Sequence, residues 1–106
     1  MATLVSTKSS TGQPSSRNRV FEFTVSMDNS YPTGGETIAA VTAALDGYTI
    51  LSSPQVANHN GAAKRHFRID PTTKKVMAYE DATLAETAAQ TDLSAHVNIP
   101  LVVIAE

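Results

Sequence analysis

The chain contains no cysteine and no tryptophan. Without cysteine, disulfide frameworks, thiol nucleophiles and cysteine-ligated zinc are all excluded. Aromatic residues make up only 6% of the 106 residues, so the core has to be built mainly from Val, Ile, Leu and Ala. Because hydrophobic residues still account for 42% of the chain, one small domain can bury a core without cross-links.

The chain also lacks a basic excess and a long apolar run. Eight Lys and Arg residues stand against ten Asp and Glu residues, which gives a formal net charge of −2. Affinity for a phosphate backbone comes from basic residues, so this balance argues against nucleic acid as a partner. No segment approaches the roughly 18 apolar residues of a membrane-spanning helix, and the first residues lack the apolar stretch of a secretory signal. We therefore expect no membrane partner.

The N-terminal segment is rich in Ser and Thr, and its large apolar residues are Leu4 and Val5. So little apolar surface cannot compensate for the entropic cost of ordering the chain. We therefore predict a flexible arm over residues 1–17 and a single β-domain over residues 18–106. Leu4 and Val5 are interface candidates, because an arm of this kind can attach to a neighbouring subunit or add a strand to its sheet.

The clearest strand pattern covers residues 19–26 (RVFEFTVS), where Phe21, Phe23 and Val25 share one face. The other predicted elements are strands at 48–53, 65–70, 75–79 and 96–105, one or two helical turns at 40–47, a loop at 54–64, and loop or extended chain at 80–95. Several short strands with so little helix predict an all-β fold, a compact antiparallel β-sandwich or barrel with one short helical turn.

The last predicted strand is apolar on both faces beyond Pro100. Val102 and Ile104 occupy the face opposite Leu101 and Val103. A strand that is apolar on both faces is covered on both, so Val102 and Ile104 are further interface candidates. Because Pro100 cannot donate to a strand ladder, it favours an edge position or a bulge.

The segment SMDNSYPTGGETI at 26–38 has two readings, a phosphate-binding loop or a turn between strands. A Walker-type loop needs a Lys after the second Gly, and TGGET has none. In a turn, Pro32 presets the entry and Gly34 and Gly35 supply positive φ angles. We predict the turn, with the Tyr31 ring packed and its hydroxyl at a rim that suits a subunit contact. Tyr31, Pro32, Gly34 and Gly35 are thus candidates for an architectural turn or a contact.

No catalytic or metal-binding arrangement is evident. The histidines at 59, 66 and 96 do not pair at metal-ligand spacing, and no G-x-S-x-G motif occurs. Carboxylates such as Asp28, Asp70 and Asp92 fall in predicted turns, where Asp commonly caps the backbone. We therefore predict no enzyme activity, no cofactor, no metal and no small-molecule substrate, although a small hydrolase with a dispersed site stays as a third class.

A basic cluster marks the predicted hairpin at 65–79. It consists of Lys64, Arg65, His66, Arg68, Lys74 and Lys75. One interpretation is a solvated face whose lysines protect a strand edge. The other is a positive patch that docks on an acidic protein surface or on nucleic acid. Of these two partners we favour protein, because few aromatic residues are interleaved and the net charge is negative. Charge runs are usually solvent faces, so we favour the first interpretation.

The order of the segments resembles a known class of proteins. A strand leads into SYPTGGE, followed by AAVTAALDG and a further strand. The hairpin FRIDPTTKKVMAY and the C-terminal TDLSAHVNIPLVVIAE complete the series. Over residues 19–105 this resembles small virion structural proteins of tailed bacteriophages, of the capsid decoration or cement type. YPTGGE, at 31–36, is the most specific part.

The resemblance implies an all-β protein without catalysis on the outer surface of an icosahedral phage head. It implies the major capsid protein as partner and a homo-oligomer that stiffens the shell. Placement on a head rather than a tail rests on analogy. The alternative is a small β binding module, tail-associated or carbohydrate-binding, that recognises a host surface. Exposed aromatic rings would favour that alternative.

Overall fold

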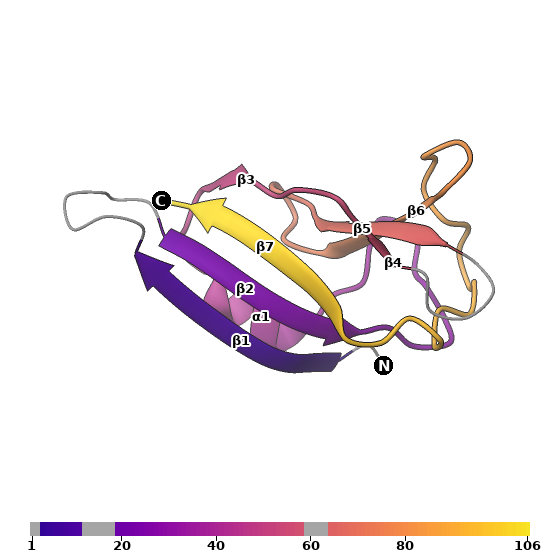
Figure 1. Ribbon diagram of the computed structural model, residues 1–106, viewed down its shortest axis with the longest axis horizontal. Coiled ribbons are helices and arrows are strands. Elements are labelled where there is room, and N and C mark those ends of the chain that lie inside the picture. Colours follow the sequence, from indigo (N-terminus) through magenta and orange to yellow (C-terminus); the bar gives the residue numbers. More distant parts are fainter. Residues whose placement is uncertain (1–2, 12–18, 59–63) are drawn as a thin grey trace.

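The computed structural model describes residues 3–11, 19–58 and 64–106. Its elements are β1 (Thr3–Thr11), β2 (Arg19–Ser26), α1 (Ala39–Ala44), β3 (Ile50–Ser52), β4 (Val56–Asn58), β5 (Arg65–Ile69), β6 (Val76–Glu80) and β7 (Ile99–Ala105). They form two antiparallel sheets, a large sheet in the order β1-β2-β7-β3 and a small sheet in the order β4-β5-β6 (Figure 1). The predicted all-β class with one short helix is confirmed.

In the large sheet, every second side chain of β2 and β7 points toward the interior. Phe21, Phe23 and Val25 of β2 are buried, and they stand opposite buried Val103, Leu101 and Ile99 of β7. This follows from the period-two alternation of both segments, which puts every second side chain on one face. Burying each side chain of this size contributes on the order of 1.5–3 kcal/mol.

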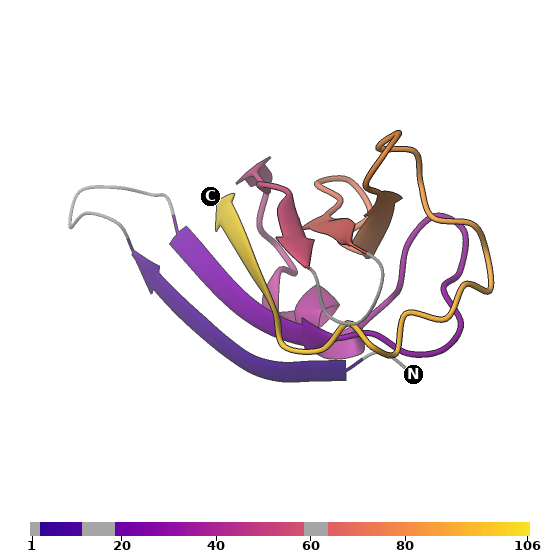
Figure 2. The ribbon, with the colours of Figure 1, turned by 45° about the vertical axis from the view of Figure 1, so that its right-hand side comes forward.

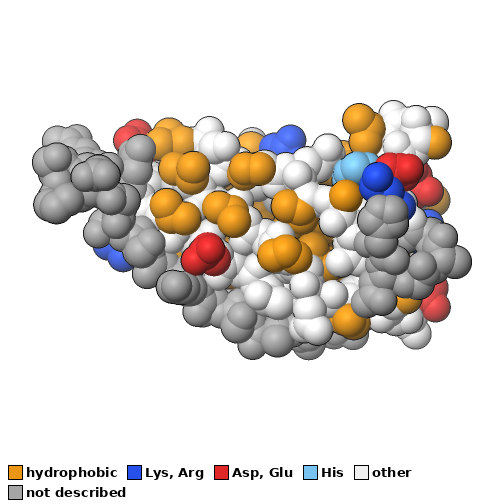
Figure 3. Space-filling model, in the orientation of Figure 1, with side chains coloured by type: hydrophobic (Ala, Val, Ile, Leu, Met, Phe, Trp, Pro, Cys, Tyr) orange, Lys and Arg blue, Asp and Glu red, His pale blue; other side chains and the backbone are white. Residues whose placement is uncertain are grey.

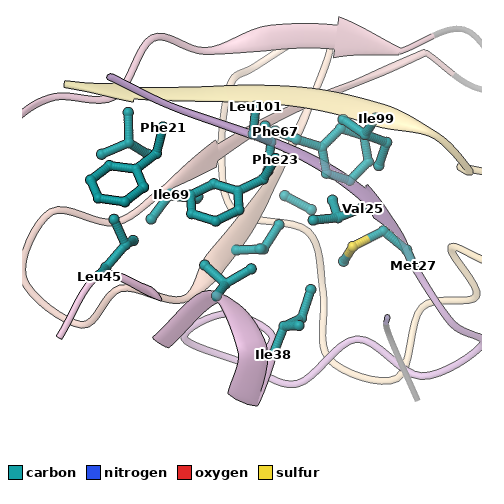
Figure 4. Packing of buried hydrophobic residues seen from close by; sticks show 14 of the residues in the cluster. Phe21, Phe23, Val25, Met27, Ile38, Leu45, Phe67, Ile69, Ile99 and Leu101 are labelled. Carbon is teal, nitrogen blue, oxygen red and sulfur yellow. The ribbon is translucent and has the colours of Figure 1, made fainter. Parts of the chain in front are cut away.

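The small sheet and α1 close the core from the other side. Phe67 and Ile69 of β5 are fully buried, as are Val41 of α1 and Leu45 just after it. Figure 2 shows the large sheet curving around α1 and the small sheet. Figure 4 shows the interior side chains of β2, β5 and β7 converging between these layers. The core therefore lies between the two sheets, and α1 packs into it.

Strand β1 corrects the prediction of a flexible arm. Thr3–Thr11 pairs antiparallel with β2, from Thr3 opposite Ser26 to Thr11 opposite Arg19, with an irregularity between Leu4 and Ser6. The small apolar surface of this segment does not prevent it from forming a strand. An extended chain rich in Thr can instead form backbone hydrogen bonds to an existing strand. The rest of the predicted arm, residues 1–2 and 12–17, lies outside the described residues.

Strand β4 is a smaller difference from the predicted elements, whereas Pro100 stands as predicted. β4 lies within the segment 54–64 that was predicted as a loop, and the correction is that Val56–Asn58 pairs with Phe67 to Arg65 of β5. Pro100 stands within β7, which has strands on both sides. However, β3 pairs only with Ile104 and Ala105, so β7 is locally an edge at Pro100, as expected.

Candidate functional site

The segment 31–36 is a turn, as predicted. The amide of Gly35 donates to the carbonyl of Pro32 at 3.1 Å, and Gly34 and Gly35 have φ angles of +92° and +111°. These angles lie in the region that side chains with a Cβ rarely adopt. The pair of glycines is therefore explained by backbone geometry.

Tyr31 differs from its predicted position. Its side chain has no exposed surface, so the hydroxyl does not lie at a rim. The hydroxyl donates to Oε2 of Glu86 at 2.8 Å and accepts from the amide of Ala78 at 3.2 Å. Burial, followed by the neighbouring Glu86 carboxylate, raises the pKa of Tyr31 well above its ordinary value. The correction is that Tyr31 is an internal link and not a subunit contact.

Glu86 holds the turn, and sequence reasoning did not identify it. The same Oε2 atom accepts the Tyr31 hydroxyl and, at 2.7 Å, the amide of Gly34. A charged acceptor makes both hydrogen bonds stronger than neutral ones. Glu86 is separated from Gly34 by 52 residues, so no local pattern indicates the contact.

The turn also packs against β6. Glu36 and Val76 exchange backbone hydrogen bonds of 2.8 and 2.9 Å. At Gly35, an added Cβ would lie 2.7 Å from Sδ of Met77 and 2.9 Å from Cβ of Lys75. A second isolated bridge joins Tyr79 to Glu86. Both ends of β6 are thus bonded on the side away from β5.

Three members of the basic cluster, Lys64, Arg65 and His66, have acidic partners. Nε of Arg65 lies 3.0 Å from Oε2 of Glu80, and Nε2 of His66 lies 2.8 Å from Oδ1 of Asp81. Nζ of Lys74 donates to the carbonyl of Leu45 at 2.9 Å. The contact with His66 is the main cause that lowers the pKa of Asp81, and the Arg65 contact is the main cause for Glu80. These pairs fit the solvated face better than a free docking patch.

The histidines do not converge. His96 is buried against the Phe67 ring, and its Nδ1 lies 2.7 Å from Oδ1 of Asn58. His66 contacts Asp81, whereas His59 lies outside the described residues. Within residues 3–11, 19–58 and 64–106, no group of three or more His, Asp or Glu side chains is placed to hold a metal ion.

The turn carboxylates behave as predicted. Oδ1 of Asp28 accepts the amide of Ser30, Oδ1 of Asp70 accepts the amides of Thr72 and Thr73, and Oδ1 of Asp92 accepts the amide of Ser94. Such bonds favour the ionised form. Backbone amides are the main cause that lowers the pKa of Asp70, and Ser94 lowers that of Asp92. The function of these carboxylates is to cap turns.

The outward face of the large sheet is where apolar side chains remain accessible. Val20 of β2 stands opposite Ile104 of β7, and Val102 stands opposite the exposed Glu22. We call Val20, Val102 and Ile104 the outer apolar surface. All three are only partly buried, so the expectation that a strand apolar on both faces is covered on both does not hold for this face in the described structure. Figure 3 shows hydrophobic side chains gathered over β2, β7 and β3.

The two remaining interface candidates belong to the large sheet as well. Leu4 pairs in register with Val25, and Val5 lies at the irregularity of β1. A shallow depression of about 420 Å³ lies elsewhere, along α1, lined by small side chains such as Ala39 and Ala43. Its lining offers no converging charged groups beyond Asp46. The outer apolar surface is therefore the best candidate for a functional site.

No helix in the described part of the chain is long and apolar enough to span a membrane. Comparison with protein-family models, curated proteins and solved structures finds no match to this chain.

Proposed function

We propose that this protein is a non-enzymatic virion structural protein of the capsid decoration type, which binds and stabilises the assembled phage head from outside. The observation that carries the proposal is the outer apolar surface on the large sheet. Exposed apolar rows on a sheet mark sites of protein contact more often than sites of chemistry. The sequence resemblance supplies the identity of the proposed partner, the major capsid protein, by analogy.

The location of the charged groups supports this proposal. Acidic and basic side chains on the small sheet pair with one another, and turn carboxylates bind backbone amides. Such groups stabilise the fold and do not converge on a substrate. The segment 31–36, the most specific part of the resemblance, serves as an internal brace.

The alternative, a module that recognises host carbohydrate, has less support. Sugar-binding sites of this kind stack sugar rings on accessible aromatic side chains. All six aromatic residues lie in the described part, and none is classed as exposed. Tyr48 packs edge-on against Phe21, and Tyr31 is fully buried. Only Tyr79, which is half-buried, is left for such a role.

The test is co-sedimentation of the full chain with assembled heads built from the major capsid protein of the same phage. The double variant Val102→Thr/Ile104→Thr keeps β-branched side chains and removes apolar surface. We expect it to stay folded and to bind heads at least about tenfold more weakly, because each buried methyl group contributes about 0.8 kcal/mol. Leu84→Asn is the control, since Leu84 is 54% exposed, lies outside the large sheet and has a φ of +57°, which Asn tolerates.

Two results would overturn the proposal. One is a wild-type chain that does not sediment with heads at any concentration. The other is a specific hit on a glycan array, which would favour the carbohydrate-binding alternative. Equal loss of head binding in Leu84→Asn and in the double variant would show that the outer apolar surface is not the contact.

A further inference from the structure

The four outermost strands of the two sheets are not equivalent. β3 and β4 are three residues long, and β6 is bonded at both ends by the bridges to Glu36 and Glu86. β1 spans nine residues and, among the described residues, pairs only with β2. Roughly half of the N–H and C=O groups of such a strand point away from its neighbour, so β1 presents a row of unpaired backbone groups.

Natural proteins usually protect an edge of this length with proline, several charges or a cover. β1 contains no proline and one charged residue, Lys8. Its irregularity lies between Leu4 and Ser6, which leaves Ser6–Thr11 as a regular ladder against Arg19–Thr24. The regular part of β1 is therefore open to a further strand.

We infer that β1 pairs antiparallel with β1 of a second copy of this chain, so that two large sheets become one continuous eight-stranded sheet. The inference rests on the proposed function for its role, since it names the contact that would make the oligomer. A two-fold axis perpendicular to the sheet keeps the same face outward in both copies. The outer apolar surfaces of both copies then lie on one side, as a capsid contact of two copies requires.

The sequence of β1 permits this self-pairing. Opposite residues of an antiparallel pair share a face of the sheet. The two-fold axis must therefore lie midway between one residue and the same residue of the second copy. An axis at Lys8 would oppose two like charges, which is unfavourable. An axis at Thr7 or at Ser9 places Lys8 opposite Ser6 or Ser10 of the second copy. In either register, charge does not oppose the pairing.

A second copy is favoured over a foreign strand for two reasons. The sequence of β1 carries a single charge, Lys8, with which to select a particular peptide, whereas identical strands are complementary in any even register. The row of Ser6, Lys8 and Ser10 stands in register with Thr24, Glu22 and Val20 of the outward face. Pairing two copies therefore extends the face that already carries the outer apolar surface.

The first test uses a matched pair of variants in sedimentation equilibrium on the full chain. Ser6→Lys/Ser10→Lys places a lysine opposite Lys8 in both allowed registers, and Ser6→Glu/Ser10→Glu places a carboxylate there. We expect the wild type to dimerise, the lysine variant to dissociate about tenfold more readily, and the glutamate variant to associate as well as or better than the wild type. The difference should shrink in high salt. Circular dichroism should show that both variants keep the wild-type fold.

The second test uses the absence of natural cysteine. Thr7→Cys should form a disulfide-linked dimer under mild oxidation if the axis passes through Thr7, and Ser9→Cys should do so if it passes through Ser9, since opposite Cα atoms lie within disulfide range. Cysteine in place of exposed Ser94, outside the sheets, is the control and should not cross-link faster than random collision.

The outcomes separate this inference from the proposed function. A wild-type chain that is monomeric at high concentration, yet sediments with heads, overturns β1 pairing and leaves the proposed function intact. A dimer on which the lysine and glutamate variants act alike shows that another surface makes the contact. A β1-paired dimer that fails to bind heads upholds the pairing and overturns the proposed function.

Discussion

The two sheets share one core but present opposite kinds of outer surface. On the large sheet, Val20, Val102 and Ile104 remain partly exposed, and the edge strand β1 has no partner beyond β2 in the described structure. On the small sheet, His66 contacts Asp81, and the edge strand β6 is bonded at one end by Glu36 and at the other by Glu86, in the loop that follows β6.

The difference teaches where contacts with other molecules are to be expected. An edge that is bonded within its own chain cannot accept another strand, and paired charges are already satisfied. An open edge beside accessible apolar side chains has the opposite properties. We therefore expect the large sheet, and not the small sheet, to take part in the proposed assembly.

The largest expected effect comes from breaking the close contact between the 31–36 turn and β6. Gly35→Ala forces a Cβ to within 2.7 Å of Sδ of Met77 and 3.2 Å of the Val76 carbonyl, at a φ of +111°. We expect a loss of about 2–4 kcal/mol in the free energy of unfolding, measured by urea denaturation. Gly34→Ala is the control. Gly34 also has a positive φ, but nothing lies within 4 Å of its added Cβ, so the loss should be only about 1 kcal/mol. Equal losses would mean that the close approach at Gly35 is unimportant.

A somewhat smaller effect should follow from removing the Glu86 carboxylate, which accepts hydrogen bonds from Tyr31 and Gly34. Glu86→Ala deprives the buried Tyr31 hydroxyl and the Gly34 amide of their acceptor. We expect a loss of about 1–3 kcal/mol, because buried donors without partners are costly. Tyr31→Phe removes the hydroxyl, and a double-mutant cycle measures the coupling between the two groups. Glu86 also lies in the bridge that covers one end of β6, the edge strand of the small sheet. If Glu86→Ala opens this edge, the variant should also self-associate more strongly. Additive losses in the cycle would contradict a direct link.

A pH dependence of stability should follow from the buried histidine, His96. Burial, with a smaller effect of Arg65, lowers the pKa of His96 below its ordinary value. The unfolded chain then takes up a proton near pH 6.5 while the folded chain does not. Stability is therefore fully present above about pH 6.5 and falls below it, by up to about 1.4 kcal/mol per pH unit until the folded pKa is reached. His96→Gln should flatten the unfolding free energy between pH 6.5 and 5. An unchanged slope in His96→Gln would exclude His96 as the cause.

The smallest effect concerns β1 and decides between a strand and an arm. Amides of β1 that point toward β2 should exchange with deuterium slowly, and those that point to the open edge should exchange fast in dilute protein. In concentrated protein the second set should slow down if two copies pair. Uniformly fast exchange over Thr3–Thr11 at all concentrations would restore the flexible arm.

The sequence predicted best those strands in which apolar and polar residues alternate along the whole element. β2 occupies 19–26 as predicted, and the hairpin of β5 and β6 lies within one residue of its predicted strands. Segment 80–95, despite its Ala, Leu and Glu content, forms turns and bridges, as expected from its lack of an apolar stripe.

Contacts between distant segments were not predictable. The acceptor role of Glu86 depends on a loop that returns to the 31–36 turn across the fold, and β1 forms because β2 offers it a backbone ladder. Neither partner is recognisable from its own neighbours in sequence. The sequence predicted two of the three residues of the outer apolar surface, because Val102 and Ile104 alternate along the last strand. The third residue, Val20, could be assigned to this surface only from the register of β2 against β7, which places it opposite Ile104.

The pairing of β2 with β7 also has a consequence for how fast the chain folds. Arg19 stands opposite Ala105, so this pairing joins residues 86 positions apart, the difference between 105 and 19. Domains dominated by such distant pairings fold in about milliseconds to seconds, because a long loop must close before the contacts form. The β1–β2 and β5–β6 hairpins join nearby residues and should form early. Until β7 pairs with β2, the Phe residues of β2 are exposed and can contact other chains. Aggregation in refolding experiments should therefore decrease at low protein concentration.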